Sequence, residues 1–181
     1  VIVAVSNLLI VNIYLPCVGV TDRLFICDEL FQFIFSWMVK YSDHVKIIAG
    51  DMNTDLDVNN PVSNLINSFS SNNNLCRCDC LLNSALKRFT YCNEALKSQS
   101  AIDFILTSNK DVITHFEVID CNSNLSDHLP ITIRCTCDVA PLCASAVASG
   151  DTNLMDVKQL RWDHANLQLY YDTTGLYLQP I

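Results

Sequence analysis

The stretch at residues 45–53, Val-Lys-Ile-Ile-Ala-Gly-Asp-Met-Asn, constrains the fold more than any other part of the chain. A short apolar run that stops at a glycine is typical of a buried strand ending at a turn. Asp51 and Asn53 then follow two positions apart, so they can lean toward the same side. A carboxylate and an amide at a strand end suit binding a cation and orienting a phosphate or water. Both are also common turn residues, so this stretch alone leaves a plain turn open.

Length and charge limit the kinds of molecule that the sequence can form. The 181 residues are enough for one domain, or one domain with an appendage, and half of them are apolar, which supplies a sizeable core. The formal net charge of -8 at pH 7 argues against a broadly basic nucleic-acid-binding surface. A phosphate substrate would therefore have to be met by a metal ion and a few local cations.

Cysteines are frequent, ten in all, but their spacing does not match a zinc ribbon. Cys76, Cys78 and Cys80 alternate along the chain, whereas zinc ribbons pair two C-x-x-C motifs. On strands, such cysteines would face one way and pack as small hydrophobic side chains. With no evident export signal, we expect reduced cysteines in an intracellular protein. The apolar start of the chain is too short and too interrupted to span a bilayer, so we expect no membrane segment.

The first fifty residues follow a strand, helix, strand pattern. Residues 1–5 and 8–14 are β-rich runs joined by two polar residues, which predicts a hairpin whose second strand is covered on both faces. The apolar residues of 21–41 recur at three and four positions, which predicts a helix with its aromatic stripe packed in the core. The strand at 45–50 completes the unit.

The remaining elements are predicted to be shorter. A weak helical period within 59–75 indicates a short helix, followed by an irregular loop at 70–74. Further short strands are expected at 76–82, 88–91, 101–107, 116–120 and 131–137. Several strands interleaved with few helices predict an α/β domain with α+β layering.

The last quarter of the chain has a different composition. Residues 139–153 are rich in alanine, serine, proline and glycine without a period, which is typical of a linker. Residues 154–181 contain regularly placed leucines and aromatic residues, which predicts a C-terminal helical extension. The expected domain is therefore 1–138.

Asp103 lies inside the apolar segment Ala-Ile-Asp-Phe-Ile-Leu at residues 101–106. A carboxylate among apolar residues is costly to bury without a partner. His128 is a suitable partner, because a carboxylate behind an imidazole fixes its tautomer and raises its basicity. Two alternatives stay open: Asp103 can point outward from an edge strand, and the Ser-Asp-His string at 126–128 can form a turn or a helix cap. The serine-hydrolase elbow, the P-loop and the dinucleotide fingerprint are absent from the sequence.

Four motifs occur in order: Val-Asn-Ile-Tyr-Leu-Pro at 11–16, Ile-Ala-Gly-Asp-Met-Asn at 48–53, Ser-Ala-Ile-Asp-Phe-Ile at 100–105 and Ser-Asp-His-Leu-Pro at 126–130. Together they resemble the motifs of the endonuclease/exonuclease/phosphatase superfamily, the fold of abasic-site endonucleases and DNase I. The resemblance covers nearly the whole chain. It implies the C-terminal part of a four-layer α/β sandwich.

Two further segments resemble the branch of this superfamily found in non-LTR retrotransposons, the long interspersed elements. Phe-Thr-Tyr at 89–91 fits the threonine motif of that branch. The tail, from Leu160 to Tyr171, resembles the segment that links such endonucleases to reverse transcriptase. A reverse transcriptase domain is therefore expected downstream.

The resemblance implies a role for each residue of the expected catalytic set. Asp51 would polarise or deprotonate the attacking water, and Asn53 would help to hold the phosphate. Tyr14 would donate to the phosphate as charge builds on it. Asp103 would orient His128, which would contact the scissile phosphate.

The resemblance also implies a metal ion and two supporting residues. Asp127 would help to hold Mg²⁺ or Mn²⁺, which neutralises the charge that develops on the phosphate oxygens. Ser126 and Thr90 would support the site or touch DNA. The family also places an asparagine and a metal-binding glutamate before the tyrosine motif, and neither has a counterpart here. We therefore expect an N-terminally truncated chain with impaired activity.

Three functions compete on this sequence. The first is a metal-dependent phosphodiesterase, the endonuclease domain that nicks target DNA for retrotransposition and acts in the nucleus. The second is a phosphatase of small phosphoesters such as phosphoinositides, which the acidic charge favours and the tail disfavours. The third is an inactive degenerate fragment or a binding module.

Overall fold

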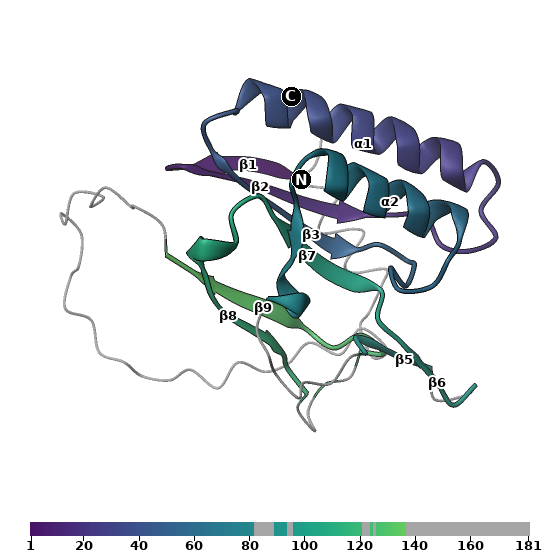
Figure 1. Cartoon of the computed structure of the whole chain (residues 1–181). Helices are drawn as coiled ribbons and strands as arrows, with labels where there is room; N and C mark the ends of the chain where they lie inside the picture. Colours follow the sequence, from purple (N-terminus) through teal and green to yellow (C-terminus); the bar gives the residue numbers. More distant parts are fainter. Residues whose placement is uncertain (82–88, 94–95, 121–123, 125, 137–181) are drawn as a thin grey trace, which may run out of the picture. The chain divides into compact units, whose positions relative to one another are not determined.

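The computed structural model describes residues 1–81, 89–93, 96–120, 124 and 126–136 (Figure 1). Its largest element is a five-stranded sheet in the order β1-β2-β3-β7-β4. The bounds of these strands are Ile2–Val5 for β1, Leu8–Tyr14 for β2, Val45–Asp51 for β3, Cys76–Arg77 for β4 and Asp103–Thr107 for β7. The predicted hairpin of β1 and β2 is confirmed, and Ser6 at its turn has the positive φ of 55° that a tight connection needs.

The three middle strands bring their polar ends to one edge of the sheet. β2 and β3 are parallel and are connected by α1 (Arg23–Lys40), whereas β7 runs antiparallel to β3. The C-terminal ends of β2 and β3 and the start of β7 therefore meet at the same edge. The register pairs Tyr14 with Asp51, and Asp51 with Asp103. Three of the expected site residues thus form one row across three strands.

Two helices cover one face of this sheet (Figure 1). The second, α2 (Pro61–Asn72), begins with a capping box in which the Asn60 side chain accepts from the Ser63 amide and the Ser63 side chain accepts from the Asn60 amide. The buried side chains between helices and sheet include Leu9, Val11, Cys27, Phe31, Ile34, Met38, Ile48, Ile66, Phe104 and Leu106.

The opposite face of the sheet is covered only in part. β8 (Ile113–Val118) and β9 (Ile131–Cys135) form an antiparallel pair that packs there in a second apolar cluster with buried residues of β2, β3 and β7. Along β2 burial alternates, and Ile10, Asn12 and Tyr14 are exposed. The prediction that the second strand of the first hairpin is covered on both faces is therefore wrong.

The shorter elements differ in detail from their predictions. β5 (Tyr91–Asn93) and β6 (Ser98–Ser100) pair with each other, and 3-10 turns occupy Cys78–Cys80 and Lys110–Val112. The predicted loop at 70–74 begins late, since α2 continues to Asn72. The side chains of Ser71 and Asn73 donate to the helix carbonyls of Asn67 and Phe69.

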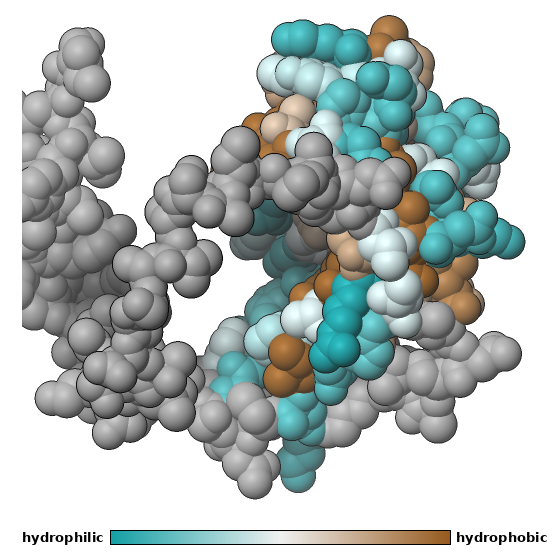
Figure 2. Space-filling model, turned by 90° about the vertical axis from the view of Figure 1, so that its left-hand side faces the viewer, coloured by the Kyte–Doolittle hydropathy of each residue, from teal (hydrophilic) through white to brown (hydrophobic). Residues whose placement is uncertain are grey.

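The aromatic stripe of α1 is not core packing throughout, contrary to prediction. The buried residues of α1 are Cys27, Phe31, Ile34 and Met38. Phe25, Phe33 and Phe35 remain 62%, 54% and 48% exposed. Figure 2 likewise shows hydrophobic surface, in brown, interleaved with hydrophilic surface on the face that it presents.

The cysteines do not share one face. Cys78 is buried, and burial raises the pKa of its thiol to about 12, whereas Cys76 and Cys80 are exposed. The 3-10 turn at Cys78–Cys80 breaks the alternation of an extended strand. No disulfide joins the cysteines in the described part of the chain.

The described residues all belong to the compact unit Val1–Leu142. Within that part, no helix is long and apolar enough to cross a membrane. The predicted linker at 139–153 and helical extension at 154–181 lie outside the described residues and stay predictions, as does the domain boundary at 138.

Candidate active site

Asp103 and His128 meet in the structure, as the sequence predicted. Asp103 Oδ2 lies 2.9 Å from His128 Nδ1, and the two side chains are 15% and 32% exposed. With the hydrogen on Nδ1, the imidazole donates to the carboxylate and keeps Nε2 for another partner. This bond and the low exposure of Asp103 exclude the alternative in which its carboxylate points outward into solvent.

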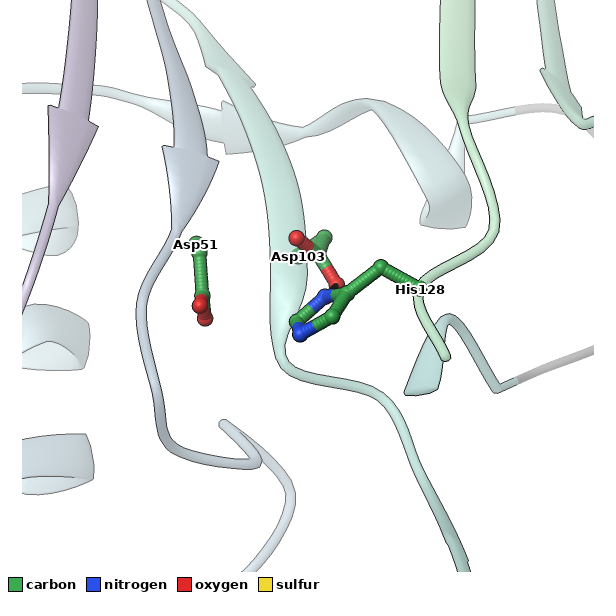
Figure 3. Close-up of side chains that lie close together, drawn as sticks. All are labelled: Asp51, Asp103 and His128. Atoms are coloured by element: carbon green, nitrogen blue, oxygen red, sulfur yellow. Dashed lines mark hydrogen bonds and ion pairs between the residues drawn. The ribbon is translucent and has the colours of Figure 1, made fainter. Parts of the chain in front are cut away.

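Asp51 completes a three-residue cluster with this pair. One ligand atom from each of Asp51, Asp103 and His128 lies within 4.8 Å of the others. Figure 3 shows the three side chains gathered at the ends of β3 and β7 and beside the segment before β9. The plain-turn interpretation of residues 50–53 does not explain this convergence.

The Asp51 carboxylate is held by its neighbour Asn53. The Asn53 amide donates to Asp51 Oδ1 at 2.7 Å, and its side-chain Nδ2 donates to Asp51 Oδ2 at 3.1 Å. Nδ2 also donates to the carbonyl of Leu15 at 2.8 Å, so both of its hydrogens are used. In this arrangement Asn53 orients Asp51, and holding a phosphate through Nδ2 would require that side chain to release a partner.

The environment of Asp51 disfavours its charged form. Burial raises its pKa above the usual aspartate value, the hydrogen bond from the Asn53 backbone opposes the rise, and the charges of Asp103 and Asp127 add to it. Three carboxylates near one imidazole create a local excess of negative charge. A divalent cation at this place would relieve that repulsion.

Gly50 allows β3 to approach β2 next to the site. Its φ is +140°, and a Cβ there would lie 1.9 Å from the backbone oxygen of Ile13. No side chain fits at that distance, so the glycine sets how closely the two strands run where Asp51 begins.

Tyr14 stands at the end of the row and is 72% exposed. The strand pairing places it beside Asp51, and the next amide, that of Leu15, donates to the Asp51 carbonyl at 2.9 Å. Its hydroxyl is thus carried on a rigid strand end, in solvent at the same edge as the carboxylates.

The segment before β9 holds His128 through local hydrogen bonds. Ser126 Oγ accepts from the His128 amide at 3.0 Å, and Asn124 Nδ2 donates to the His128 carbonyl at 2.8 Å. Asp127 is exposed, and its carbonyl accepts from the Cys92 amide at 2.8 Å. Ser126 therefore holds the backbone of His128, and Asp127 is exposed to solvent.

Thr90 is a support rather than a surface residue. It is 4% exposed, and its hydroxyl oxygen accepts from the amides of Ile102 and Asp103 at 3.1 and 3.0 Å. Its carbonyl also accepts from the Leu129 amide at 2.6 Å. Thr90 thus ties the start of β7 to the segment that carries His128, and its burial excludes direct contact with DNA in this conformation.

Two residues of this region were given no role from the sequence. The ring of Tyr91 lies 5.0 Å from that of His128 between centroids, and the two residues form a backbone bridge. Arg23, at the start of α1, donates to the Asn53 carbonyl at 2.7 Å. Tyr91 is part of the Phe-Thr-Tyr motif at 89–91, so the sequence contained a signal for it, whereas no motif pointed to Arg23.

The donor set fits a divalent cation. Asp51 and Asp103 supply carboxylate oxygens, the ligands that Mg²⁺ and Mn²⁺ prefer. Asp127, the metal ligand expected from the sequence, is exposed and is not part of this cluster. His128 Nδ1 is engaged by Asp103, which leaves Nε2 as the ring nitrogen that can meet a cation or a substrate.

Solved structures with the same architecture include a 3' phosphatase from Neisseria bound to product DNA hairpin, with a TM-score of 0.59 and 16% identity. The chain has the endonuclease/exonuclease/phosphatase fold. A protein of that family from Leptotrichia buccalis has a TM-score of 0.54 and 18% identity, and a mannosyl-6-phosphatase from Bacteroides thetaiotaomicron has 0.52 and 18%. The predicted layered α/β class is confirmed.

The similarity covers much of this chain but less of the others. It spans 75% of this chain and 63% of the Neisseria protein, 72% and 48% for the Leptotrichia protein, and 72% and 52% for the mannosyl-6-phosphatase. The chain thus matches between about half and two-thirds of the length of the structures that share its fold. No protein-family model and no curated protein matches the sequence.

Proposed function

We propose that this chain carries the C-terminal part of a metal-dependent phosphodiesterase site and acts as an endonuclease that nicks DNA for retrotransposition. The observation that carries the proposal is the convergence of Asp51, Asp103 and His128 at one sheet edge. The Neisseria phosphatase, whose structure contains a product DNA hairpin, has the same fold, and this is consistent with a nucleic-acid substrate. The choice of DNA and the retrotransposon origin rest on the threonine motif and on the tail at 160–171.

In the proposed reaction, water attacks phosphorus as the bond to the leaving oxygen breaks. Asp51 accepts the proton of that water, and its orientation comes from Asn53. Tyr14 and His128, the latter with a hydrogen on Nε2 as well as on Nδ1, donate to the phosphate oxygens as charge accumulates, and Asp103 holds the imidazole. A bound Mg²⁺ or Mn²⁺ would neutralise developing oxyanion charge, with Asp127 among its ligands.

We further propose that a full site needs the asparagine and glutamate that the family places before the tyrosine motif. That glutamate would be a ligand of the cation. A reverse transcriptase domain would follow downstream in the complete protein.

The test is Mg²⁺-dependent nicking of supercoiled plasmid by the chain, and by the chain preceded by a segment that supplies the two family residues. We expect nicking to rise with the added segment and to fall by roughly two orders of magnitude or more in Asp51→Ala and His128→Ala. Asp43→Ala and His44→Ala are matched controls, because these residues form a similar pair, 2.8 Å apart, just before β3 begins. Nicking that survives Asp51→Ala and His128→Ala would show that the site is wrongly assigned.

A phosphatase of small phosphoesters is the second candidate. The net charge of -8 favours it, because tight DNA binding normally gains from many cationic contacts with phosphates. One solved structure of this fold is a mannosyl-6-phosphatase. Release of inorganic phosphate from small phosphoesters, without plasmid nicking, would favour this candidate over the endonuclease.

A further inference from the structure

Arg23 links two loops that leave the site edge of the sheet. Its Nε donates to the Pro16 carbonyl at 2.7 Å, and its Nη2 donates to the Asn53 carbonyl at 2.7 Å. Pro16 follows β2 and Asn53 follows β3, so one half-buried guanidinium joins the chain beyond both strand ends. The planar fork of arginine suits two carbonyls at once.

Few other hydrogen bonds hold these loops together, and their buried side chains Leu15 and Met52 pack in the core. The pairing of β2 with β3 ends at Tyr14 and Asp51. Beyond that row, the Leu15 amide donates to the Asp51 carbonyl, and the Asn53 side chain donates to the Leu15 carbonyl. Asn53 itself has a φ of +48°, a left-handed conformation that needs support from its surroundings.

The position of Arg23 at the start of a helix is electrostatically unfavourable for a cation. It is the first residue of α1, where the helix dipole is positive and repels a cation. The first turn of α1 has no acidic residue, and its N-cap, Asp22, makes no side-chain cap bond. The two bonds to loop carbonyls are therefore the interactions that offset this repulsion.

From these contacts we infer that Arg23 is a positioning residue for phosphoester hydrolysis. It fixes the Asn53 backbone, Asn53 holds both oxygens of the Asp51 carboxylate, and the carboxylate thereby faces the substrate in one orientation. Arg23 acts through Asn53 and touches neither the phosphate nor the cation. The inference rests on the proposed function for its catalytic part, whereas the loop linkage rests on the hydrogen bonds alone.

The first arm of the test needs no turnover. Amide hydrogen exchange would be followed by NMR in the wild type, in Arg23→Met and in Lys40→Met. Lys40→Met removes a cation from the other end of the same helix, where its ammonium lies over the Trp37 ring. We expect the Asn53 and Leu15 amides to exchange at least about tenfold faster than in wild type in Arg23→Met, and at the wild-type rate in Lys40→Met. In Arg23→Met, local opening of the loops no longer has to break the Arg23 hydrogen bonds. Unchanged exchange of the Asn53 amide would overturn the inference, whether or not the chain hydrolyses phosphoesters.

The second arm measures steady-state hydrolysis of a phosphodiester in Mg²⁺. Because the Asp51 carboxylate would be less well oriented in Arg23→Met, we expect its kcat to be at least about tenfold below that of wild type. Its KM should stay within about twofold of the wild-type value. Arg23→Lys should recover part of the kcat, since an ammonium can reach one of the two carbonyls. A raised KM with unchanged kcat would overturn the inference by showing that Arg23 binds substrate. An inactive wild type would count against the proposed function and leave the exchange arm to decide the linkage.

Discussion

At the scale of single residues, the site depends on how Asp51 is kept ionised and oriented. Its carboxylate is partly buried, accepts two hydrogen bonds from Asn53, and lies near two other carboxylates. Burial and like charges work against ionisation, whereas the backbone hydrogen bond favours it. The balance raises the pKa, which is useful for a proton acceptor but costs stability.

The raised pKa of Asp51 gives a prediction for stability against pH. In the folded chain the carboxyl releases its proton at a higher pH than in the unfolded chain, so ionisation destabilises the fold as pH rises through the folded pKa. The free energy of unfolding of wild type should therefore fall relative to that of Asp51→Asn as the pH of a metal-free buffer rises from about 3, below the usual aspartate pKa, to neutral. Urea unfolding at several pH values measures this. A difference that stays the same from about pH 3 to neutral pH would contradict the pKa shift.

Thr90 gives a second prediction at this scale. Thr90→Val keeps the shape of the side chain but leaves the amides of Ile102 and Asp103 without their acceptor. Loss of such partners in a buried place costs about 1–3 kcal/mol, so the free energy of unfolding should fall by that order. Thr90→Ser retains the hydroxyl and is the matched control. Equal stability of the two variants would show that the hydroxyl does not support β7.

At the scale of elements, the site is made by strand ends that meet because α1 connects two parallel strands. The close approach of β3 to β2 at Gly50 is the tightest part of this arrangement. It fixes the distance between the ends that carry Tyr14 and Asp51. Strand geometry, more than loop sequence, therefore sets the site.

Gly50→Ala tests that approach. Its Cβ would clash with the Ile13 backbone, so we expect the free energy of unfolding to fall by roughly 2 kcal/mol or more. Gly19→Ala is the control, because Gly19 also has a positive φ, +97°, but no atom lies within 4 Å of the added Cβ. Urea denaturation of both variants separates the clash from the backbone strain. Equal losses would show that the strand approach is not tight.

The first strand-helix-strand unit was predictable because its signals are local: apolar runs, a turn and a helical period. The buried face of α1 was not, since α1 is apolar around most of its circumference and the sheet and α2 decide which side is covered. The contact of Asp103 with His128 followed from the cost of burying a lone carboxylate. The bonds of Arg23 and Asn53 could not be predicted, because their acceptors are backbone carbonyls that no residue type identifies.

At the scale of the whole molecule, one sheet edge collects residues from four segments of the chain. The outermost of these residues, Tyr14 and His128, are 114 positions apart in the sequence. The proposed function requires these segments to build a site for a divalent cation. The acidic chain offers other carboxylates to a cation, such as Asp55, Asp57 and Asp79, so the location of binding matters more than its strength.

Paramagnetic NMR with Mn²⁺ locates the ion directly. At substoichiometric Mn²⁺, we predict that the amide signals of Asp51, Asp103 and His128 broaden first, and that Mg²⁺ in excess restores them. The exposed pair Asp43 and His44 is an internal control for adventitious binding and should keep sharp signals. Broadening that begins at Asp43 and His44, or is spread evenly over the acidic surface, would contradict a cation site at this sheet edge.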